Sequence, residues 1–258
     1  MTARDALDAA VDALTAAGVE TPRLDAEVLI ADALGVARAD LVIDPSLPVS
    51  GAAARLIGER VRRRVAREPV AYILGVKGFR RLVLQVDSRV LIPRPETELL
   101  VEVALELPAG ARVHDVGTGS GAVALALRNE RPDLVVTGSD ASSVAVQVAQ
   151  ANGLDAFVHS GLPVGEYDMV AANLPYVRED EWASLAPEIR LWEPREALVY
   201  GEDGLDAIRS LVVQAAPGTQ LALEHAPGQT AAVEGLLRRP RTWLDLAGRP
   251  RVTVGVAP

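Results

Sequence analysis

The chain has 258 residues, of which 49% are hydrophobic and 24% are charged. This composition is typical of soluble globular proteins, and the length allows one large domain and a small accessory one. A formal net charge of −9 argues against a general nucleic-acid binder, because such proteins carry a basic surface. The chain has no cysteine and only three histidines, so we expect chemistry without disulfides, thiols or a metal ion.

The first part of the chain shows helical periodicity. From Arg4 to about Arg67 apolar residues recur every three or four positions, with glycines where helices would end and Ser50 as a helix cap. We therefore expect an N-terminal helical domain over residues 1–75. Its arginine-rich run at 60–67 could contact an acidic partner, but a solvated arginine face is the simpler interpretation.

The pattern changes to strict alternation in the stretch "GFRRLVLQVDSRVLIP". Leu82, Leu84 and Val86 fall on one face, which predicts a β-hairpin. We place a hairpin linker at residues 76–92.

Short apolar runs alternate with helical stretches from Arg112 onward. Strands are expected at "RVHDVG", "LVVTGSD", "YDMVAAN" and "QLALEH", with helices beginning near Ala122, Ser142 and Leu205. Repeated strand–helix units predict an α/β fold with a doubly wound, mainly parallel sheet over residues 93–258. No run reaches the roughly 18 apolar residues of a membrane span, and the N-terminus lacks a signal-peptide pattern, so we expect a cytoplasmic protein.

A glycine loop follows the first of these strands. Gly117, Gly119 and Gly121 let the backbone turn tightly against a ligand, and Asp140 at the end of the next strand can accept hydrogen bonds from ribose hydroxyls. The loop also satisfies G-x-G-x-x-A, so a dinucleotide is one candidate ligand. Asp115 would repel a pyrophosphate but could accept from the ammonium group of S-adenosylmethionine, which favours the methyl donor. The remaining alternative is a loop that only closes a strand–helix turn.

Four residues, Asn173 to Tyr176, follow the strand "YDMVAA" and should lie at the carboxyl edge of the sheet, where ligands bind. The side-chain carbonyl of Asn173 and the backbone carbonyl of Leu174 could both accept from one planar NH2 group, and Pro175 favours an extended backbone before it. Tyr176 could lie over that group. The pattern indicates a delocalised nitrogen, in an amide or a nucleobase, that is held for reaction, although a simple proline turn with a capping asparagine is the alternative.

Taken together, these motifs resemble the release factor glutamine methyltransferases of the HemK/PrmC type over nearly the whole chain. The resemblance rests on "EPVAYILGVKGF", "VLIPRPETELLVE", "DVGTGSGAVALAL", "ANLPYV" and "EPREALVYGEDGLDAIRSL", in that order. It implies a class I, Rossmann-like methyltransferase domain with a seven-stranded, mainly parallel sheet. It also implies S-adenosylmethionine as cofactor, with S-adenosylhomocysteine as product. The substrate would be the glutamine amide of the GGQ motif in class 1 peptide chain release factors.

The resemblance also assigns roles by position. With Asp115 from the charge argument, the cofactor-binding residues would be Asp115, Gly117, Thr118, Gly119, Ser120, Gly121, Asp140 and Asn173. The substrate-binding residues would be Asn173, Leu174, Pro175 and Tyr176, with Asn173 and Tyr176 acting in catalysis. The helical domain would grip the release factor. We expect a monomer without a metal, a membrane or a direct nucleic-acid partner.

Two departures from the family pattern stand out. Leu174 replaces the second residue of N-P-P-Y, and since its backbone carbonyl does the accepting we expect the chemistry to survive. The segment "VHSGLPVGEYD" lacks the family's acidic and aromatic residues beside adenine, with Leu162 as the apolar substitute. Three other functions remain open: an amino-methyltransferase acting on adenine in RNA or DNA, a nicotinamide-dependent oxidoreductase and a non-catalytic binding module.

Flanking residues allow two interpretations. Arg94, Glu96 and Thr97 in "IPRPETE" either begin a helix or reach the cofactor. The segment 193–195 is expected to fix a loop. All three histidines, at positions 114, 159 and 225, are expected to be structural.

Overall fold

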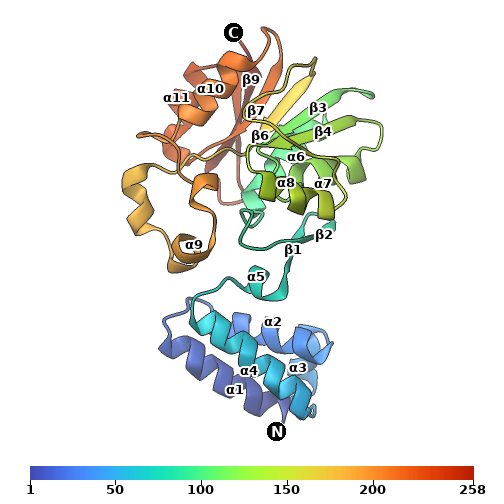
Figure 1. Ribbon diagram of the computed structural model, residues 1–258, viewed down its shortest axis with the longest axis vertical. Coiled ribbons are helices and arrows are strands. Elements are labelled where there is room, and N and C mark those ends of the chain that lie inside the picture. Colours follow the sequence, from blue (N-terminus) through green and yellow to red (C-terminus); the bar gives the residue numbers. More distant parts are fainter. The chain divides into compact units, whose positions relative to one another are not determined.

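The computed structural model describes residues 1–258, which form two compact units. The helical unit comprises Met1–Gly75 with Ala186–Trp192, and the sheet unit comprises Val76–Leu185 with Glu193–Pro258. Figure 1 labels the elements of both units along the chain. The sequence pattern assigns residues 186–192 to the second domain, whereas the structure places them in the helical unit.

Five helices precede the sheet unit. They are α1 (Ala3–Ala16), α2 (Pro22–Leu34), α3 (Arg38–Ile43), α4 (Gly51–Val65) and α5 (Val70–Leu74). Their ends follow local chemistry: Thr2 forms a capping box with Asp5, the Ser50 hydroxyl accepts from Ala53 N, and Gly35 ends α2 in the left-handed conformation. Apolar faces of α1, α2 and α4 meet in one buried cluster. Helix periodicity therefore identified this unit well.

The arginine run of α4 differs from the expected solvated face. Arg64 is buried, and its Nε donates to Asp25 Oδ2 at 2.6 Å. Its Nη2 donates to Glu188 Oε1 at 2.7 Å, and Arg67 contacts the same carboxylate. Glu188 belongs to α9 (Pro187–Trp192), so these ion pairs explain why that distant segment is part of the helical unit.

The expected hairpin is formed by β1 (Val76–Phe79) and β2 (Leu82–Gln85), which pair antiparallel. Phe79 and Leu84 are buried in the core of the sheet unit. Asn152 fixes the end of β2, because its side chain accepts from Gln85 N at 2.7 Å and donates to Gln85 O at 3.0 Å. The hairpin is thus a packed part of the sheet unit.

The remaining elements of the sheet unit are strands, α-helices and 3-10 turns. The strands are β3 (Arg112–Val116), β4 (Val135–Asp140), β5 (Phe157–Val158), β6 (Met169–Ala172), β7 (Gln220–Glu224), β8 (Arg238–Leu244) and β9 (Pro250–Val256). The helices are α6 (Glu98–Leu105), α7 (Ala122–Glu130), α8 (Ser143–Ala151), α10 (Asp206–Gln214) and α11 (Thr230–Gly235). The 3-10 turns are Pro95–Thr97, Glu179–Ser184, Arg195–Ala197 and Pro227–Gln229.

These strands form one seven-stranded sheet in the order β5-β4-β3-β6-β7-β9-β8. The strands from β5 to β7 are parallel, and β9 pairs antiparallel with both β7 and β8. The expected α/β fold with a mainly parallel seven-stranded sheet is confirmed. The order reverses between β3 and β6, which is the place where open parallel sheets bind ligands at their carboxyl ends.

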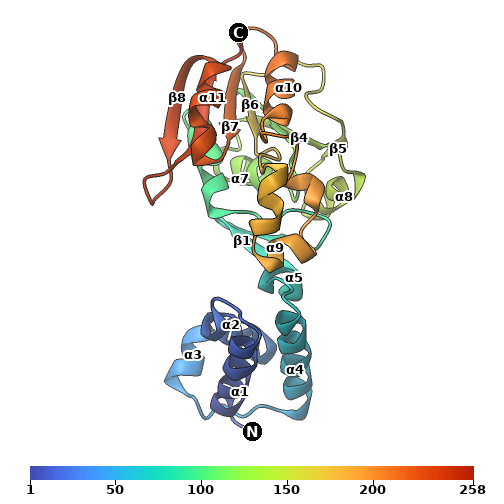
Figure 2. The same cartoon turned by 90° about the vertical axis from the view of Figure 1, so that its left-hand side faces the viewer.

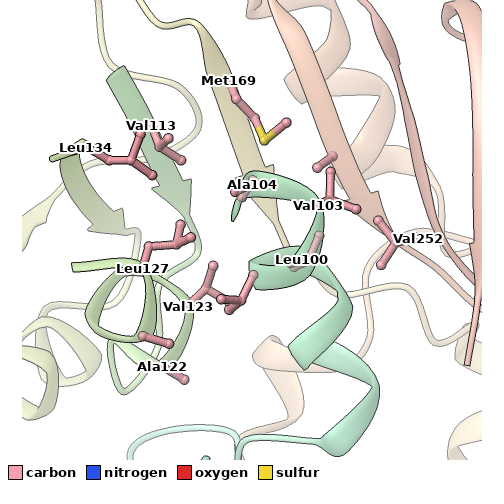
Figure 3. Close-up of a cluster of buried hydrophobic side chains, with 14 of the residues drawn as sticks. Leu100, Val103, Ala104, Val113, Ala122, Val123, Leu127, Leu134, Met169 and Val252 are labelled. Carbon is pink, nitrogen blue, oxygen red and sulfur yellow. The ribbon is translucent and has the colours of Figure 1, made fainter. Parts of the chain in front are cut away.

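Helices cover both faces of the sheet. Figure 1 and Figure 2 show α6, α7 and α8 on one face and α10 and α11 on the other. Figure 3 shows the cluster under α6 and α7, where Leu100 and Leu127 pack toward Val113 and Met169 of the strands. A second cluster joins α10 and α11 to the opposite face. None of the helices combines the length and the apolar character that crossing a bilayer would need.

Candidate active site

A cavity of about 610 Å³ lies in the sheet unit at the carboxyl ends of β3, β4 and β6. It is bordered by most of the residues that the sequence singled out: Asp115, Gly117, Thr118, Gly119, Ser120, Asp140, Asn173, Leu174 and Pro175. Gly121 and Tyr176 do not line it. The topological switch between β3 and β6 therefore brings the two sequence motifs to one cavity.

The glycine loop, Gly117–Gly121, has a backbone that only glycine adopts easily at three positions. Gly117, Gly119 and Gly121 have φ angles of 72°, 55° and 85°. A side chain added at Gly119 would meet no atom within 4 Å, so this residue leaves open space beside the cavity that it lines. Gly121 instead caps α7 and packs against Leu125 and Leu154. The loop thus presents backbone to the cavity at Gly119.

Asp115 is a buried acid under this loop. Its Oδ2 accepts from Thr118 Oγ1 at 2.6 Å and from Ala124 N at 3.3 Å. Burial raises the pKa of Asp115 to about 6, against the effect of these two hydrogen bonds, and the charge of Asp140 raises it slightly further. A cationic group in the cavity would favour the ionised form of this carboxyl.

Asp140 ends β4 and is held by backbone amides. Its Oδ2 accepts from Gly119 N at 2.9 Å and its Oδ1 from Ser142 N at 2.9 Å. Burial raises its pKa, while the same two hydrogen bonds lower it. A carboxylate has about four lone-pair positions, so it can still accept hydrogen bonds from a ligand's hydroxyl groups.

This set of groups fits S-adenosylmethionine. The ligand carries an ammonium group that Asp115 can attract, two ribose hydroxyls that Asp140 can bind and a chain that needs the close backbone approach at Gly119. A pyrophosphate would meet the Asp115 carboxyl instead of the phosphate-binding surface that it needs, whereas Asp140 suits the ribose of either ligand. The charges of the cavity therefore favour the methyl donor over a dinucleotide.

The NLPY loop, Asn173–Tyr176, forms the other wall. Asn173 Nδ2 donates to Thr97 Oγ1 at 3.0 Å, so the side-chain carbonyl of Asn173 is not used in this contact. A Cβ at Gly117 would lie 3.1 Å from Leu174 Cδ2, so the leucine side chain packs against the glycine loop. It also packs against the core cluster that contains Val116. The sequence predicted a role only for the backbone carbonyl of Leu174. The structure adds a contact of its side chain with the glycine loop.

Tyr176 points away from the cavity wall. Its hydroxyl donates to Glu224 Oε1 at 3.3 Å, and Glu224 is the last residue of β7. Its carbonyl accepts from Gln229 Nε2 at 3.0 Å. A Cβ at Gly204 would lie only 2.1 Å from that carbonyl oxygen, which leaves no space for any side chain there. The stacking of Tyr176 on a substrate group stays a prediction.

Sequence reasoning missed Glu224, Gln229 and the role of Gly204. Glu224 stood in the sequence as an acid that ends the apolar strand "QLALEH", which is an unusual place for a charge and is a usable signal. Gly204 belongs to "GEDGLD", one of the motifs on which the family resemblance rests. Its close contact with the Tyr176 carbonyl of the NLPY loop is a physical reason for glycine at this position.

The "IPRPETE" motif both begins a helix and reaches the cavity. Arg94 and Thr97 line the cavity, whereas Glu96 lies near Arg249 and Arg251. Arg94 Nη2 donates to Glu193 Oε1 at 2.5 Å, and Glu193 Oε2 accepts from Ile92 N at 3.2 Å. Glu193 therefore fixes a loop, as its sequence context predicts.

The histidines do not share one environment. His114 bridges Thr137 and Ser139 at 2.7 and 2.9 Å, and burial lowers its pKa to about 4. His225 is buried against Thr253. Both are structural, as expected. His159 differs, because it lines the cavity.

The wall beyond Asp140 corrects one expectation. Leu162 packs against the core on the α10 side and does not line the cavity, so it does not replace an adenine-facing residue. The lining residues there are Ala141, Ser142, His159, Ser160 and Gly161. Gln214 Oε1 accepts from Leu162 N at 2.8 Å and holds this short segment on α10.

Known proteins match both units. The sequence fits the description "PrmC N-terminal domain" over residues 5–75 and "Methyltransferase small domain" over residues 95–184. The release factor glutamine methyltransferase of Caulobacter vibrioides is 38% identical, with 96% of this chain and 94% of the relative covered. The protein of the same name from Cereibacter sphaeroides is 40% identical, with 98% and 97% covered.

Among solved structures, the release factor-specific protein-(glutamine-N5) methyltransferase from Alicyclobacillus acidocaldarius is 26% identical. The match covers 66% of this chain and 97% of the Alicyclobacillus chain, with a TM-score of 0.39. The family relationship rests on the sequence relatives, which extend over both units.

Proposed function

Because the chain belongs to the family of release factor glutamine methyltransferases, we propose that it methylates the side-chain amide nitrogen of a glutamine in a peptide chain release factor. The observation that carries this proposal is the meeting of the NLPY loop and the glycine loop at one cavity. Asn173 is anchored through its NH2 group, which leaves its carbonyl to accept from a substrate amide.

The cofactor would lie along the glycine loop. Asp115 would balance its ammonium group, Asp140 would bind the ribose hydroxyls and Gly119 would allow the close backbone approach. Thr118, Ser120, Gly117 and Asn173 complete the proposed cofactor wall, and Gly121 acts from behind by starting α7. When bound, S-adenosylmethionine supplies an electrophilic methyl group on a positively charged sulfur.

The NLPY loop would hold the glutamine. The carbonyls of Asn173 and Leu174 accept from the two N–H groups of one amide, which orients the nitrogen toward the cofactor wall. As the nitrogen gains positive charge, these fixed carbonyl dipoles stabilise it, and the N–H proton that the methylated nitrogen then loses is acidic enough to pass to water without a strong base. Pro175 keeps the loop extended. Tyr176 would have to turn from Glu224 toward the cavity before it could cover the substrate amide. Positioning is the main catalytic contribution.

The substrate partner would be a class 1 release factor, through the glutamine of its GGQ motif. We propose that the helical unit helps to bind the release factor. The net charge of −9 is better suited to such a protein partner than to RNA or DNA. A monomeric, metal-independent enzyme of the cytoplasm is consistent with these features.

Mass spectrometry of the GGQ-bearing peptide tests the function. Incubation with a release factor and S-adenosylmethionine should add one methyl group to the glutamine. Asn173→Ala should reduce the rate at least ~100-fold, because one preorganised acceptor is removed. Asn129→Ala, an exposed change on α7, is the matched control and should behave as wild type.

Calorimetry of S-adenosylmethionine binding to both variants separates loss of the amide contact from loss of the cofactor. The absence of methyl transfer to every release factor would contradict the proposal. Transfer into RNA instead of protein would support the adenine methyltransferase alternative.

A further inference from the structure

A buried acid lies behind the NLPY loop, outside the cavity. Glu224 is only 1% exposed and ends β7, the strand next to β6 from which the loop emerges. Its Oε1 accepts from the Tyr176 hydroxyl at 3.3 Å, while its Oε2 is buried without a hydrogen-bond partner. Burying such a group costs free energy, so its presence needs a reason.

Thr97 lies between this acid and the substrate-facing asparagine. Its Oγ1 accepts from Asn173 Nδ2 at 3.0 Å. The same hydroxyl lies close enough to the Glu224 carboxyl to lower its pKa, but the two groups do not form a hydrogen bond in this geometry, and Glu224 Oε2 stays unpaired. The three side chains come from the segment before α6, from the end of β6 and from the end of β7, so the fold itself assembles them.

The direction in which Asn173, Thr97 and Glu224 can bond to one another depends on a single proton. A threonine hydroxyl has one hydrogen, and an ionised carboxylate can only accept. If Thr97 donates to Glu224, its oxygen can only accept from Asn173. The asparagine must then direct its NH2 group at Thr97 and its carbonyl away from it. A protonated Glu224 can donate instead, and the orientation of the asparagine amide is no longer fixed.

We propose that Glu224 is a positioning residue, which acts through Thr97 to fix the amide of Asn173 with its carbonyl available to the substrate and through Tyr176 to fix the end of the same loop. This inference rests on the proposed function, since it assigns how the acceptor of the glutamine amide is oriented. Glu224 touches neither substrate nor cofactor in this scheme.

The surroundings of Glu224 make its ionisation sensitive to pH near neutrality. Burial raises its pKa to about 7, although the nearby hydroxyl groups of Thr97 and Tyr176 oppose the rise. Two charged groups act on it directly: Glu96 raises its pKa and Arg251 lowers it. Tyr176 bonds to it, Arg94 acts on Tyr176, and the neighbouring His225 bonds to Thr253. The orientation of Asn173 should therefore be lost as the pH falls below this range.

The test compares kcat across pH 5.5–9 for the wild type and four variants of the intact protein. Glu224→Gln and Thr97→Val should lower kcat about tenfold or more, because each breaks the direction of the hydrogen bonds at nearly constant shape. Thr97→Ser keeps the hydroxyl and should restore most of the activity. Glu130→Gln, at a partly buried acid paired with Arg80, is the control and should keep the wild-type profile.

Two further readouts separate positioning from general damage. The wild type should lose kcat on the acid side with a midpoint near neutrality, and Glu224→Gln should lack this dependence. Calorimetric affinity for S-adenosylmethionine should stay within about twofold of wild type in the folded Glu224 and Thr97 variants.

Each outcome has one meaning. If the wild type methylates a release factor but Glu224→Gln keeps its kcat and pH profile, this inference is wrong while the proposed function stands. Full activity of Thr97→Val would also overturn it, since a purely electrostatic role of Glu224 needs no hydroxyl. A wild type without transferase activity would instead contradict the proposed function.

Discussion

The glycine loop and the NLPY loop face the same cavity but are shaped by different means. The glycine loop takes its form from its own backbone, through left-handed glycines and the hydrogen bonds of Gly117 N and Thr118 N to Ser139 O at 2.9 and 3.0 Å. The NLPY loop has no such internal support. Its positions are fixed by side chains of Thr97, Glu224 and Gln229, which come from distant parts of the sequence.

This difference decides how much of the conformation of each loop can be predicted from the sequence. A backbone conformation that depends on glycine is visible locally, because few other residues tolerate it. A loop held by residues from distant parts of the sequence can be recognised only by its motif. The residues that hold it can be identified only once the structure shows β6 and β7 side by side. Substitutions at the supports should therefore damage the NLPY loop as strongly as substitutions within it.

The largest effect is expected at Gly204, which borders the NLPY loop. Gly204→Ala places a methyl group 2.1 Å from the carbonyl oxygen of Tyr176, at a φ of 72°. Overpacking against backbone together with left-handed strain should cost on the order of 4 kcal/mol of unfolding free energy. Methyl transfer should fall at least ~100-fold.

Urea denaturation and the peptide methylation assay measure both effects. Gly228→Ala is the matched control, since its added methyl group meets no atom within 4 Å. A Gly204→Ala protein with wild-type stability and rate would show that the NLPY loop tolerates displacement, and the contrast between the loops would fail.

The next effect concerns the acid buried at each loop. Folded pKa values of about 6 for Asp115 and about 7 for Glu224 lie above the ordinary values of 3.8 and 4.5. Between the ordinary and the raised value the folded state binds more protons, so stability is lost as pH rises through that window. For Glu224 the loss is on the order of 3 kcal/mol between about pH 4.5 and 7.

Denaturation of the ligand-free protein from pH 4 to 8 measures this loss. Glu224→Gln should remove the upper part of the pH dependence, and Asp115→Asn should remove the lower part. A wild-type stability that is constant over this range would show that neither carboxyl is shifted as described.

The smallest effect on stability is expected at Gly119. Gly119→Ala meets no atom within 4 Å, so only its φ of 55° opposes the substitution, at about 1 kcal/mol. Its methyl group enters the space beside the cavity, and affinity for S-adenosylmethionine should fall about tenfold or more. Calorimetry measures this directly. An unchanged affinity would place the cofactor away from the glycine loop.

Much of this molecule follows from sequence patterns. Strand–helix alternation predicted the parallel sheet, and the position of Asn173 after a buried strand placed it correctly at the sheet edge beside Gly117. Long-range contacts were not predictable in this way. Arg64 looked solvated because its buried partners Asp25 and Glu188 lie far away in the sequence. Leu162 seemed to face the ligand because the tie of its segment to Gln214 has no local signal.

Leu174 connects the two loops, because its side chain lies against Gly117 on one side and its backbone belongs to the wall that we propose for the substrate on the other. A ligand that orders either loop thereby changes the free energy of ordering the other. Such coupling is reciprocal: whatever factor cofactor binding adds to the affinity for the substrate peptide, the peptide must add to the affinity for the cofactor. The order in which the two ligands bind is then decided by rates of access and has no bearing on the final equilibrium.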